Sequence, residues 1–586
     1  MSKACHDCPF NVTDCFMPHC VSADGVQKRI YAVNRQVPGP LVEVCEDDLV
    51  VVEVRNQMLS ESTTIHWHGF NQKNTPYMDG VPYVTQCPIL PGQSFTYSFE
   101  ATTMGTFFWH SHIGSQKADG MFGPMIVNRR DLITAVKALY DQDEHRMIIS
   151  DWNHLPGDSG ITRMYHYKPD VRPKSILVNG RGHYRQFEVD DGSTVYTPPA
   201  VFPVDKDKKY RIRLINAGAQ DCPIEMSIDN HTMIVISLDS NDIVATEVDW
   251  ITIWQGERVD FIVRTNQKPD NYWIRYRGYS TCRNNATSGV YQVAILHYNE
   301  VPLHEPTSPI AYQIPKSTNA TRVLNPFNSG TESWPITNIA IPNLTSLDAN
   351  DVSLSEKVDH QVYISFDFHN IDNYDFHRKH LYGYNQVPSD RRIGSLQLNH
   401  ISLKLPQFPL LSQWQRLAPG SLCNSTHTPK NLDCKTEQCA CTHVIQVKLN
   451  SVVEIVLIDQ GKSFTVNHPF HLHGHFFRVV AEENLGGVVT IDRVKQLDKE
   501  GKIKRRLNHP PMKDTMKTPG GGYTIVRFHA NNPGYWFFHC HFDQHHNVGM
   551  ALVVKVGEHK DFPKKPKGFP KCGSFKNSCL LNNKKL

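Results

Sequence analysis

The sequence lacks three features that would point to a membrane or a nucleic acid. No apolar run reaches the roughly 18 residues that a membrane-spanning helix needs. The formal net charge is only +3, because 61 Lys and Arg nearly balance 58 Asp and Glu. No leader-like apolar segment opens the numbered chain, which is compatible with a cytosolic protein or with numbering that starts after a removed leader. We therefore expect no membrane span and no nucleic-acid partner.

Long amphipathic helices are also missing. Runs rich in Val, Ile and aromatic residues recur between clusters of Pro, Gly and Asn, for example at 49–56, 210–218, 361–368, 452–459 and 523–530. Such runs at short spacing are typical of β-sandwiches and β-barrels. The sequence therefore predicts an all-β protein, and 586 residues are too many for a single core.

A weak internal repeat predicts the domain organisation. The aromatic-rich segments GTFFWHSH, NYWIRYRG and GYWFFHCH end near residues 112, 278 and 541. We predict three similar β domains at 21–135, 136–300 and 358–557. A Cys-rich segment at 1–20 precedes them, a connector rich in Pro, Asn, Ser and Thr spans 301–357, and a basic tail covers 558–586.

The 15 cysteines are an odd number. Setting Cys540 aside leaves enough for seven disulfides, and the clusters are Cys5, Cys8, Cys15 and Cys20, then Cys434, Cys439 and Cys441, then Cys572 and Cys579. Their spacing also fits zinc sites. Six N-x-S/T sequons accompany them, at Asn11, Asn230, Asn285, Asn319, Asn343 and Asn424. Together these features favour a secreted, disulfide-bonded glycoprotein, with the disulfide connectivity left open.

Four H-x-H pairs are the strongest chemical signal: His66 and His68, His110 and His112, His471 and His473, His539 and His541. On a strand, residues i and i+2 face the same way, so each pair projects two imidazoles together. A single pair would be weak, because 31 histidines give roughly one or two such pairs by chance. The pairs occur in matched contexts in the two outer domains, which favours metal binding there.

Cys540 lies between His539 and His541 and should face the opposite side of the strand. A thiolate at that position, with His468, His545 and a weak axial Met550, matches the His₂Cys-plus-Met ligand set of a blue-copper site. The intervening backbone would join this copper to the metals held by the paired histidines. This arrangement indicates one-electron intake on one side of the strand and a multi-metal centre on the other.

These motifs resemble those of the multicopper oxidases, in the laccase branch, over about residues 20–557. The stretches 20–48 and 75–89 look like insect laccases in particular. The resemblance implies three cupredoxin-like Greek-key domains and four copper ions, one type 1, one type 2 and two type 3. It places type 1 copper on His468, Cys540, His545 and axial Met550. It places type 2 copper on His66 and His471, and the type 3 coppers on His68, His110 and His541 and on His112, His473 and His539.

The resemblance also implies the reaction. Phenols or diphenols would lose single electrons at type 1 copper, and dioxygen would be reduced to water at the other three. Asp79 matches an acid near type 2 copper in the family, which suggests a role in proton delivery, although an Asp before Gly80 is also typical of a turn. Alternatives are an ascorbate oxidase, a ferroxidase, or a non-catalytic copper-binding protein. The expected partners are a small reducing substrate and dioxygen, and we expect a monomer.

Overall fold

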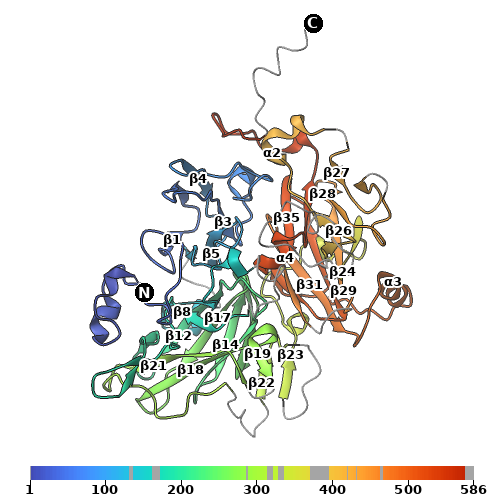
Figure 1. Cartoon of the computed structure of the whole chain (residues 1–586). Helices are drawn as coiled ribbons and strands as arrows, with labels where there is room; N and C mark the ends of the chain where they lie inside the picture. The colour runs from blue at the N-terminus through green and yellow to red at the C-terminus, as the bar shows by residue number, and fades with distance from the viewer. Residues whose placement is uncertain are drawn as a thin grey trace.

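The computed structural model describes residues 2–130, 136–160, 172–285, 288–312, 321–327, 336–369, 395–418, 420–429, 432–461 and 466–573. Strands dominate these ranges, so the predicted all-β fold is confirmed. The strands form three consecutive groups, drawn blue, green and orange to red in Figure 1. We call them the N-terminal, middle and C-terminal units. In the described part of the chain, no helix is long and apolar enough to cross a membrane.

The N-terminal unit follows two short 3-10 turns, η1 (Lys3–Cys5) and η2 (Val12–Phe16). One of its sheets has the order β1-β6-β5-β3, and β2 pairs with β4 in another. Buried and exposed residues alternate along β2 and β4, which is typical of strands that pack one face on a core and expose the other to solvent. Strand β5 is buried throughout. The bounds are β1 (Val42–Cys45), β2 (Leu49–Arg55), β3 (Ile65–His68), β4 (Ser94–Glu100), β5 (Gly105–Ser111) and β6 (Phe122–Asn128).

The middle unit has two larger sheets, with the orders β11-β21-β18-β13-β16-β22-β23 and β15-β14-β17-β12-β7-β8. Two of the strands, β22 (Thr321–Leu324) and β23 (Ile336–Ile339), lie in the predicted connector and extend the first sheet. The others are β7 (Gln142–Trp152), β8 (Ser175–Val178), β9 (Phe187–Glu188), β10 (Thr194–Val195), β11 (Val201–Val204), β12 (Lys209–Asn216), β13 (Ile224–Ile228), β14 (Met233–Leu238), β15 (Asn241–Val248), β16 (Trp250–Ile253), β17 (Arg258–Arg264), β18 (Asn271–Gly278), β19 (Arg283–Asn285), β20 (Ser288–Gly289) and β21 (Tyr291–Tyr298).

The C-terminal unit is one long curled sheet with the order β32-β31-β34-β29-β24-β25-β26-β28-β36-β35-β30-β33, and β27 pairs with β28. Its strands are β24 (His360–His369), β25 (Ser395–Leu398), β26 (Ile401–Leu403), β27 (Leu422–Cys423), β28 (Cys439–Val447), β29 (Val452–Asp459), β30 (His468–Leu472), β31 (Phe477–Asn484), β32 (Met512–Lys513), β33 (Thr515–Thr518), β34 (Gly522–His529), β35 (Gly534–Cys540) and β36 (Ala551–Val556). Its helices are α2 (Leu410–Gln413), α3 (Ile491–Lys499) and α4 (Asp543–Asn547).

Strand β35 connects the units through its two faces. Tyr535 and Phe537 belong to the hydrophobic cluster of the N-terminal unit, whereas Trp536, Phe538 and Cys540 belong to the cluster that includes the interior of the C-terminal unit. Since successive residues on a strand face opposite ways, His539 lies on the side of the N-terminal unit. The placement of Cys540 opposite its histidine neighbours therefore follows from the packing of this strand.

The structure contains six disulfides among the described cysteines: Cys5–Cys20, Cys8–Cys15, Cys87–Cys572, Cys222–Cys282, Cys423–Cys441 and Cys434–Cys439. All cysteines of the first two clusters, at 5–20 and at 434–441, take part in these bonds, so the prediction of zinc sites there is wrong. Cys45 and Cys540 are the unpaired cysteines of the described ranges, and Cys579, with residues 574–586 of the basic tail, lies outside them. The Cys87–Cys572 bond ties the described part of the tail back onto the N-terminal unit.

Candidate copper centre

The four H-x-H pairs are carried by strands that pair in register. In the N-terminal unit, His66 on β3 lies opposite His110 on β5. In the C-terminal unit, His471 on β30 lies opposite His539 on β35. Each sheet therefore presents its imidazoles side by side, and the two sets meet where the units pack together.

The meeting of these sets creates three clusters of histidines. Within each cluster the ligand nitrogens lie within 4.8 Å of one another, and the clusters are His66, His68 and His471; His68, His110 and His541; and His112, His473 and His539. The second and third are the triplets that the resemblance assigns to the two type 3 coppers. The first contains the pair assigned to type 2 copper.

The hydrogen bonds of these histidines show which nitrogens are free. The Nδ1–H of His66 donates to the carbonyl of Asp79 at 2.7 Å, and that of His471 donates to the carbonyl of Asp514 at 2.9 Å. His110 Nδ1 donates in the same way to the Ser111 carbonyl at 2.9 Å. The Nε2 atoms of these three histidines are buried and have no hydrogen-bond partner.

Buried nitrogens without a partner are rare in folded proteins unless a ligand satisfies them. Here the free lone pairs converge, with Nε2 of His473 and His539 3.2 Å apart and Nε2 of His541 3.2 Å from Nδ1 of His68. Imidazole nitrogens are good ligands for copper. The residues present therefore fit copper ions at this place.

Burial also keeps four of these imidazoles neutral. Desolvation, reinforced by the neighbouring histidines, holds the pKa of His68, His473 and His539 well below the usual value, and burial with the nearby Lys117 does so for His541. Neutral imidazole is the form that binds a metal, because its lone pair is not occupied by a proton. The rings are thus in the ligating form at neutral pH.

Two buried carboxylates contact the clusters. Asp79, which ends the 3-10 turn η3 (Pro76–Met78), places Oδ2 3.0 Å from His473 Nδ1 and Oδ1 3.3 Å from His66 Nδ1. Asp514 lies between β32 and β33, 3.4 Å from His471 Nδ1 and 3.3 Å from His68 Nε2. Burial alone would raise the pKa of Asp514, but Arg258 and His471 hold it well below its usual range.

The residues predicted for type 1 copper lie on the other face of β35. Cys540 Sγ is 3.5 Å from His545 Nδ1, and the rings of His468 and His545 are 5.1 Å apart between centroids. His468 turns Nδ1 toward Asp459 Oδ2 at 3.1 Å, and its Nε2 is buried without a partner. No triplet of described ligand atoms that includes Cys540 lies within 4.8 Å of one another, in contrast to the histidine clusters.

Met550 and the thiol of Cys540 complete the description of that face. Met550 is fully buried, its carbonyl accepts from the Cys540 N–H at 3.1 Å, and its N–H donates to the His545 carbonyl at 3.0 Å. Burial raises the pKa of the Cys540 thiol well above its usual value. A thiolate at this position therefore requires a bound cation, which deprotonates a coordinating thiol.

Lys117 is a site residue that sequence reasoning missed. Its Nζ donates to the Gly218 carbonyl at 2.9 Å and pairs with Asp543 Oδ1 at 3.0 Å, and it lies 3.3 Å from His541 Nδ1. The three units therefore meet at this lysine, beside a predicted ligand. A single Lys in GSQKADG carries no spacing signal that could have indicated it.

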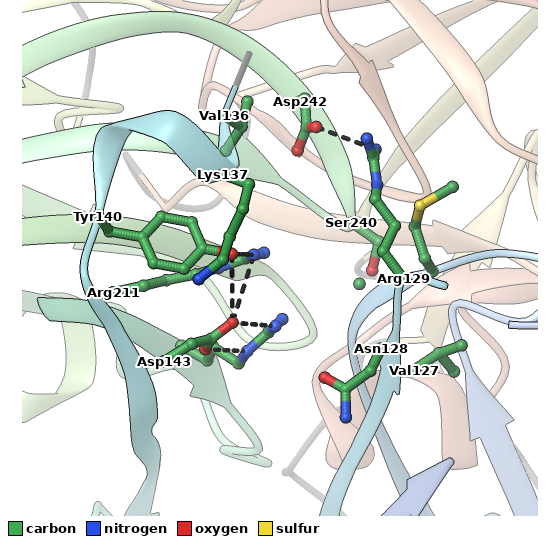
Figure 2. Close-up of a pocket in the computed structure, with 13 residues that line it drawn as sticks. Val127, Asn128, Arg129, Val136, Lys137, Tyr140, Asp143, Arg211, Ser240 and Asp242 are labelled. Carbon is green, nitrogen blue, oxygen red and sulfur yellow. Dashed lines mark hydrogen bonds and ion pairs between the residues drawn. The ribbon is translucent and has the colours of Figure 1, made fainter. Parts of the chain in front are cut away.

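Two cavities differ in their relation to the histidines. A cavity of about 470 Å³ is lined by His112 and His546, together with Tyr83, Leu405 and Phe537, so it reaches the cluster. A separate cavity of about 230 Å³, shown in Figure 2, lies between the N-terminal and middle units and shares no lining residue with the predicted copper ligands. Two of its arginines pair with its two aspartates, Arg129 with Asp242 and Arg213 with Asp143.

Comparison with known proteins places the chain in a family. Family models described as multicopper oxidase match residues 16–132, 143–301 and 414–560. Laccase-2 of Botryotinia fuckeliana is 31% identical over 539 residues, covering 91% of this chain and 79% of that protein. The solved laccase of Botrytis aclada is 27% identical with a TM-score of 0.69, covering 93% of this chain and 86% of the other.

Fet3p, a multicopper oxidase that functions in iron import, has the same fold, with 24% identity and a TM-score of 0.70, covering 93% of this chain and 90% of the other.

The chain belongs to the multicopper oxidase family. Within that family it is a laccase-type oxidase built from three cupredoxin-like domains, with one type 1, one type 2 and two type 3 copper ions. It acts on a small-molecule substrate and dioxygen.

The laccase branch expected from the sequence is confirmed, and the relatives found are fungal. The narrower expectation of a likeness to insect laccases in particular is not borne out, because the laccases that match this chain are fungal. The domain boundaries and the role of each predicted ligand stay predictions.

Gly80 provides a test of how the first histidine pair is positioned. It has a φ of +86°, and a Cβ there would lie 1.9 Å from the carbonyl oxygen of Ile65 on β3. We expect Gly80→Ala to displace β3 and to lower both the copper content and the melting temperature. Gly92→Ala is the matched control, since Gly92 has a φ of +75° and no atom within 4 Å of the added Cβ. It should cost only the left-handed backbone strain, about 1–2 kcal/mol, and keep its copper. Equal copper loss in both variants would contradict this explanation.

Proposed function

We propose that this chain is a secreted, monomeric phenol and diphenol oxidase. Its type 1 copper would be held by His468, Cys540 and His545 with Met550 as a weak axial ligand. Type 2 copper would be held by His66 and His471, and the two type 3 coppers by His68, His110 and His541 and by His112, His473 and His539. When bound, the copper ions supply one-electron oxidation of the substrate and four-electron reduction of dioxygen to water.

One observation carries this proposal: the two faces of β35. Cys540 packs into the hydrophobic cluster on one side, whereas His539 faces the histidines on the other. His539 Nδ1 also donates to the Cys540 carbonyl at 2.9 Å. Adjacent residues of one strand thus belong to both predicted sites, which gives electrons a short covalent path between them.

Other residues would control the access of dioxygen and water to the copper ions and would transfer protons. The cavity of about 470 Å³ that reaches His112 and His546 offers a route for dioxygen to enter and for water to leave. Asp79 is fully buried and contacts two imidazoles, which supports a role in holding His66 and His473 and in moving protons. A simple turn aspartate would have no reason to be buried between two histidines.

Oxygen uptake with a panel of substrates tests the proposed substrate class. Catechol, hydroquinone, a methoxyphenol, ascorbate and Fe²⁺ should be compared at equal concentration and pH. We expect the highest turnover with the diphenols. Faster uptake with ascorbate or Fe²⁺ would instead favour an ascorbate oxidase or a ferroxidase with the same copper sites.

Cys540→Ser tests the type 1 assignment. A hydroxyl is a poor replacement for a soft thiolate, so the blue absorption and substrate oxidation should both disappear. Copper bound by the histidine clusters should remain, which a metal assay would show. Cys45→Ser is the matched control, because Cys45 is an exposed cysteine outside the site. A blue Cys540→Ser variant would remove Cys540 from the proposed ligands.

Met550→Leu tests the axial ligand. A thioether donates electron density to copper and favours the oxidised form, whereas Leu donates none. The substitution conserves volume and should cost less than about 1.5 kcal/mol of stability. We expect the type 1 reduction potential to rise, measured by redox titration of the blue band. An unchanged midpoint would identify Met550 as a packing residue only.

Asp79→Asn tests the buried carboxylate beside His66 and His473. The amide keeps the shape but removes the charge and can accept at only one of its two positions. We expect reoxidation of the reduced enzyme by dioxygen to slow, about 10- to 100-fold, as for losses of groups that support metal ligands. Stopped-flow absorption measures this, and reduction of the type 1 site by substrate should be unchanged. Normal reoxidation would leave Asp79 with a turn-forming role.

A further inference from the structure

The middle unit carries no predicted copper ligand, yet its charged residues reach the histidine clusters. Five buried side chains form a chain of ion pairs at its contact with the C-terminal unit, and each is at most 1% exposed. They are Asp239, Glu257 and Arg258 of the middle unit and Lys513 and Asp514 of the C-terminal unit. Burying so many charges is costly unless each has partners, so the arrangement needs a reason beyond packing.

Arg258 is the residue of this group that spans all three units. From the start of β17, its guanidinium donates to both oxygens of Asp514, at 2.6 Å each, and to the carbonyl of Thr106 in the N-terminal unit at 3.0 Å. It also presses against the end of β3, because a Cβ on Gly69 would lie 2.5 Å from its terminal nitrogen. A bidentate pair of this kind fixes the plane of the carboxylate as well as its charge.

Asp514 in turn contacts two imidazoles through different nitrogens. Its carbonyl and Oδ1 face His471 Nδ1 at 2.9 and 3.4 Å. The same Oδ1 is 3.3 Å from His68 Nε2, which is also 3.1 Å from Thr515 Oγ1. An acceptor at these positions places the proton of His471 on Nδ1 and that of His68 on Nε2. The free lone pairs are then Nε2 of His471 and Nδ1 of His68, which faces His541.

We propose that Arg258 is a positioning residue of the type 2 and type 3 copper centre, acting through Asp514. By holding that carboxylate in one plane, it makes His471 bind copper through Nε2 and His68 through Nδ1. The middle unit would therefore contribute to the copper centre, although it carries no predicted ligand. This inference rests on the proposed assignment of His471 and His68 as copper ligands.

The structure contains a matched control for the test. Arg275 on β18 of the same unit is 5% exposed and also makes a bidentate pair, with Asp229 at 2.6 and 2.7 Å. Neither Arg275 nor Asp229 belongs to the histidine clusters. Arg258→Met and Arg275→Met therefore both remove a buried arginine from a bidentate pair with an aspartate, and only the first should disturb the imidazoles.

The experiment compares copper retention and spectra of the wild-type chain and both variants, each purified with copper. Measurements are copper per chain under competition with a chelator, the electron paramagnetic resonance signal of type 2 copper, the blue band and the melting temperature. We expect Arg258→Met to hold type 2 copper about 10- to 100-fold more weakly and to change its hyperfine splitting, with the blue band retained. Arg275→Met should lower the melting temperature while its copper content and spectra match the wild type.

Two further variants keep the test decisive. If Arg258→Met does not fold, Arg258→Lys can replace it, because lysine keeps the positive charge but cannot make the bidentate pair with Asp514. Arg258→Lys should still alter the type 2 signal. Asp514→Asn should alter it as well. Wild-type copper content and signal in Arg258→Lys and Asp514→Asn would overturn the inference. His471→Ala tests the ligand assignment itself. A type 2 signal that survives this change would show that His471 is not a type 2 ligand, which would contradict the proposed function and not only the role of Arg258.

Discussion

The structure depends on keeping eight imidazoles dry and partly unsatisfied at the contact between the first and last units. Most of these rings use one nitrogen for a hydrogen bond to the protein, and several of the remaining nitrogens are buried without a partner. Such a surface is unfavourable without cations, because buried polar atoms that lack partners cost free energy. The paired strands, the buried carboxylates and the cross-unit ion pairs can all be understood as means of holding this arrangement in place.

Strand geometry explains why so much of the site was predictable. H-x-H spacing on a strand places two rings on one face, and the intervening Cys540 must then face the other. This argument from a few residues anticipated the two faces of β35. The grouping of the paired histidines into the two type 3 triplets came instead from the resemblance to multicopper oxidases, and the structure places the members of each triplet as neighbours. The resemblance also pointed to Asp79 beside type 2 copper, although the sequence alone could not separate a buried carboxylate from a turn aspartate.

The residues that were missed have long-range partners and no local pattern. Arg258 and Asp514 are 256 positions apart, and Lys117 reaches His541 across 424. The sequence around Arg258, Asp514 and Lys117 does not reveal these contacts, because the partners are brought together only when the units dock. The disulfide connectivity could not be predicted for the same reason, since Cys87 and Cys572 are joined across 485 positions. It also hid β22 and β23, whose strand character depends on the sheet edge they extend.

The separation of the two halves of the centre along the chain has a consequence for how the protein is made. His68 and His541 are 473 positions apart, and β35 lies near the end of the chain. During synthesis the first histidines leave the ribosome long before their counterparts exist, so none of the three histidine clusters can be completed early on the growing chain. Copper loading is therefore a late event in biogenesis, following the docking of the last unit. The Cys87–Cys572 bond, which closes over that docked arrangement, marks a stage after which the first and last units can no longer drift apart.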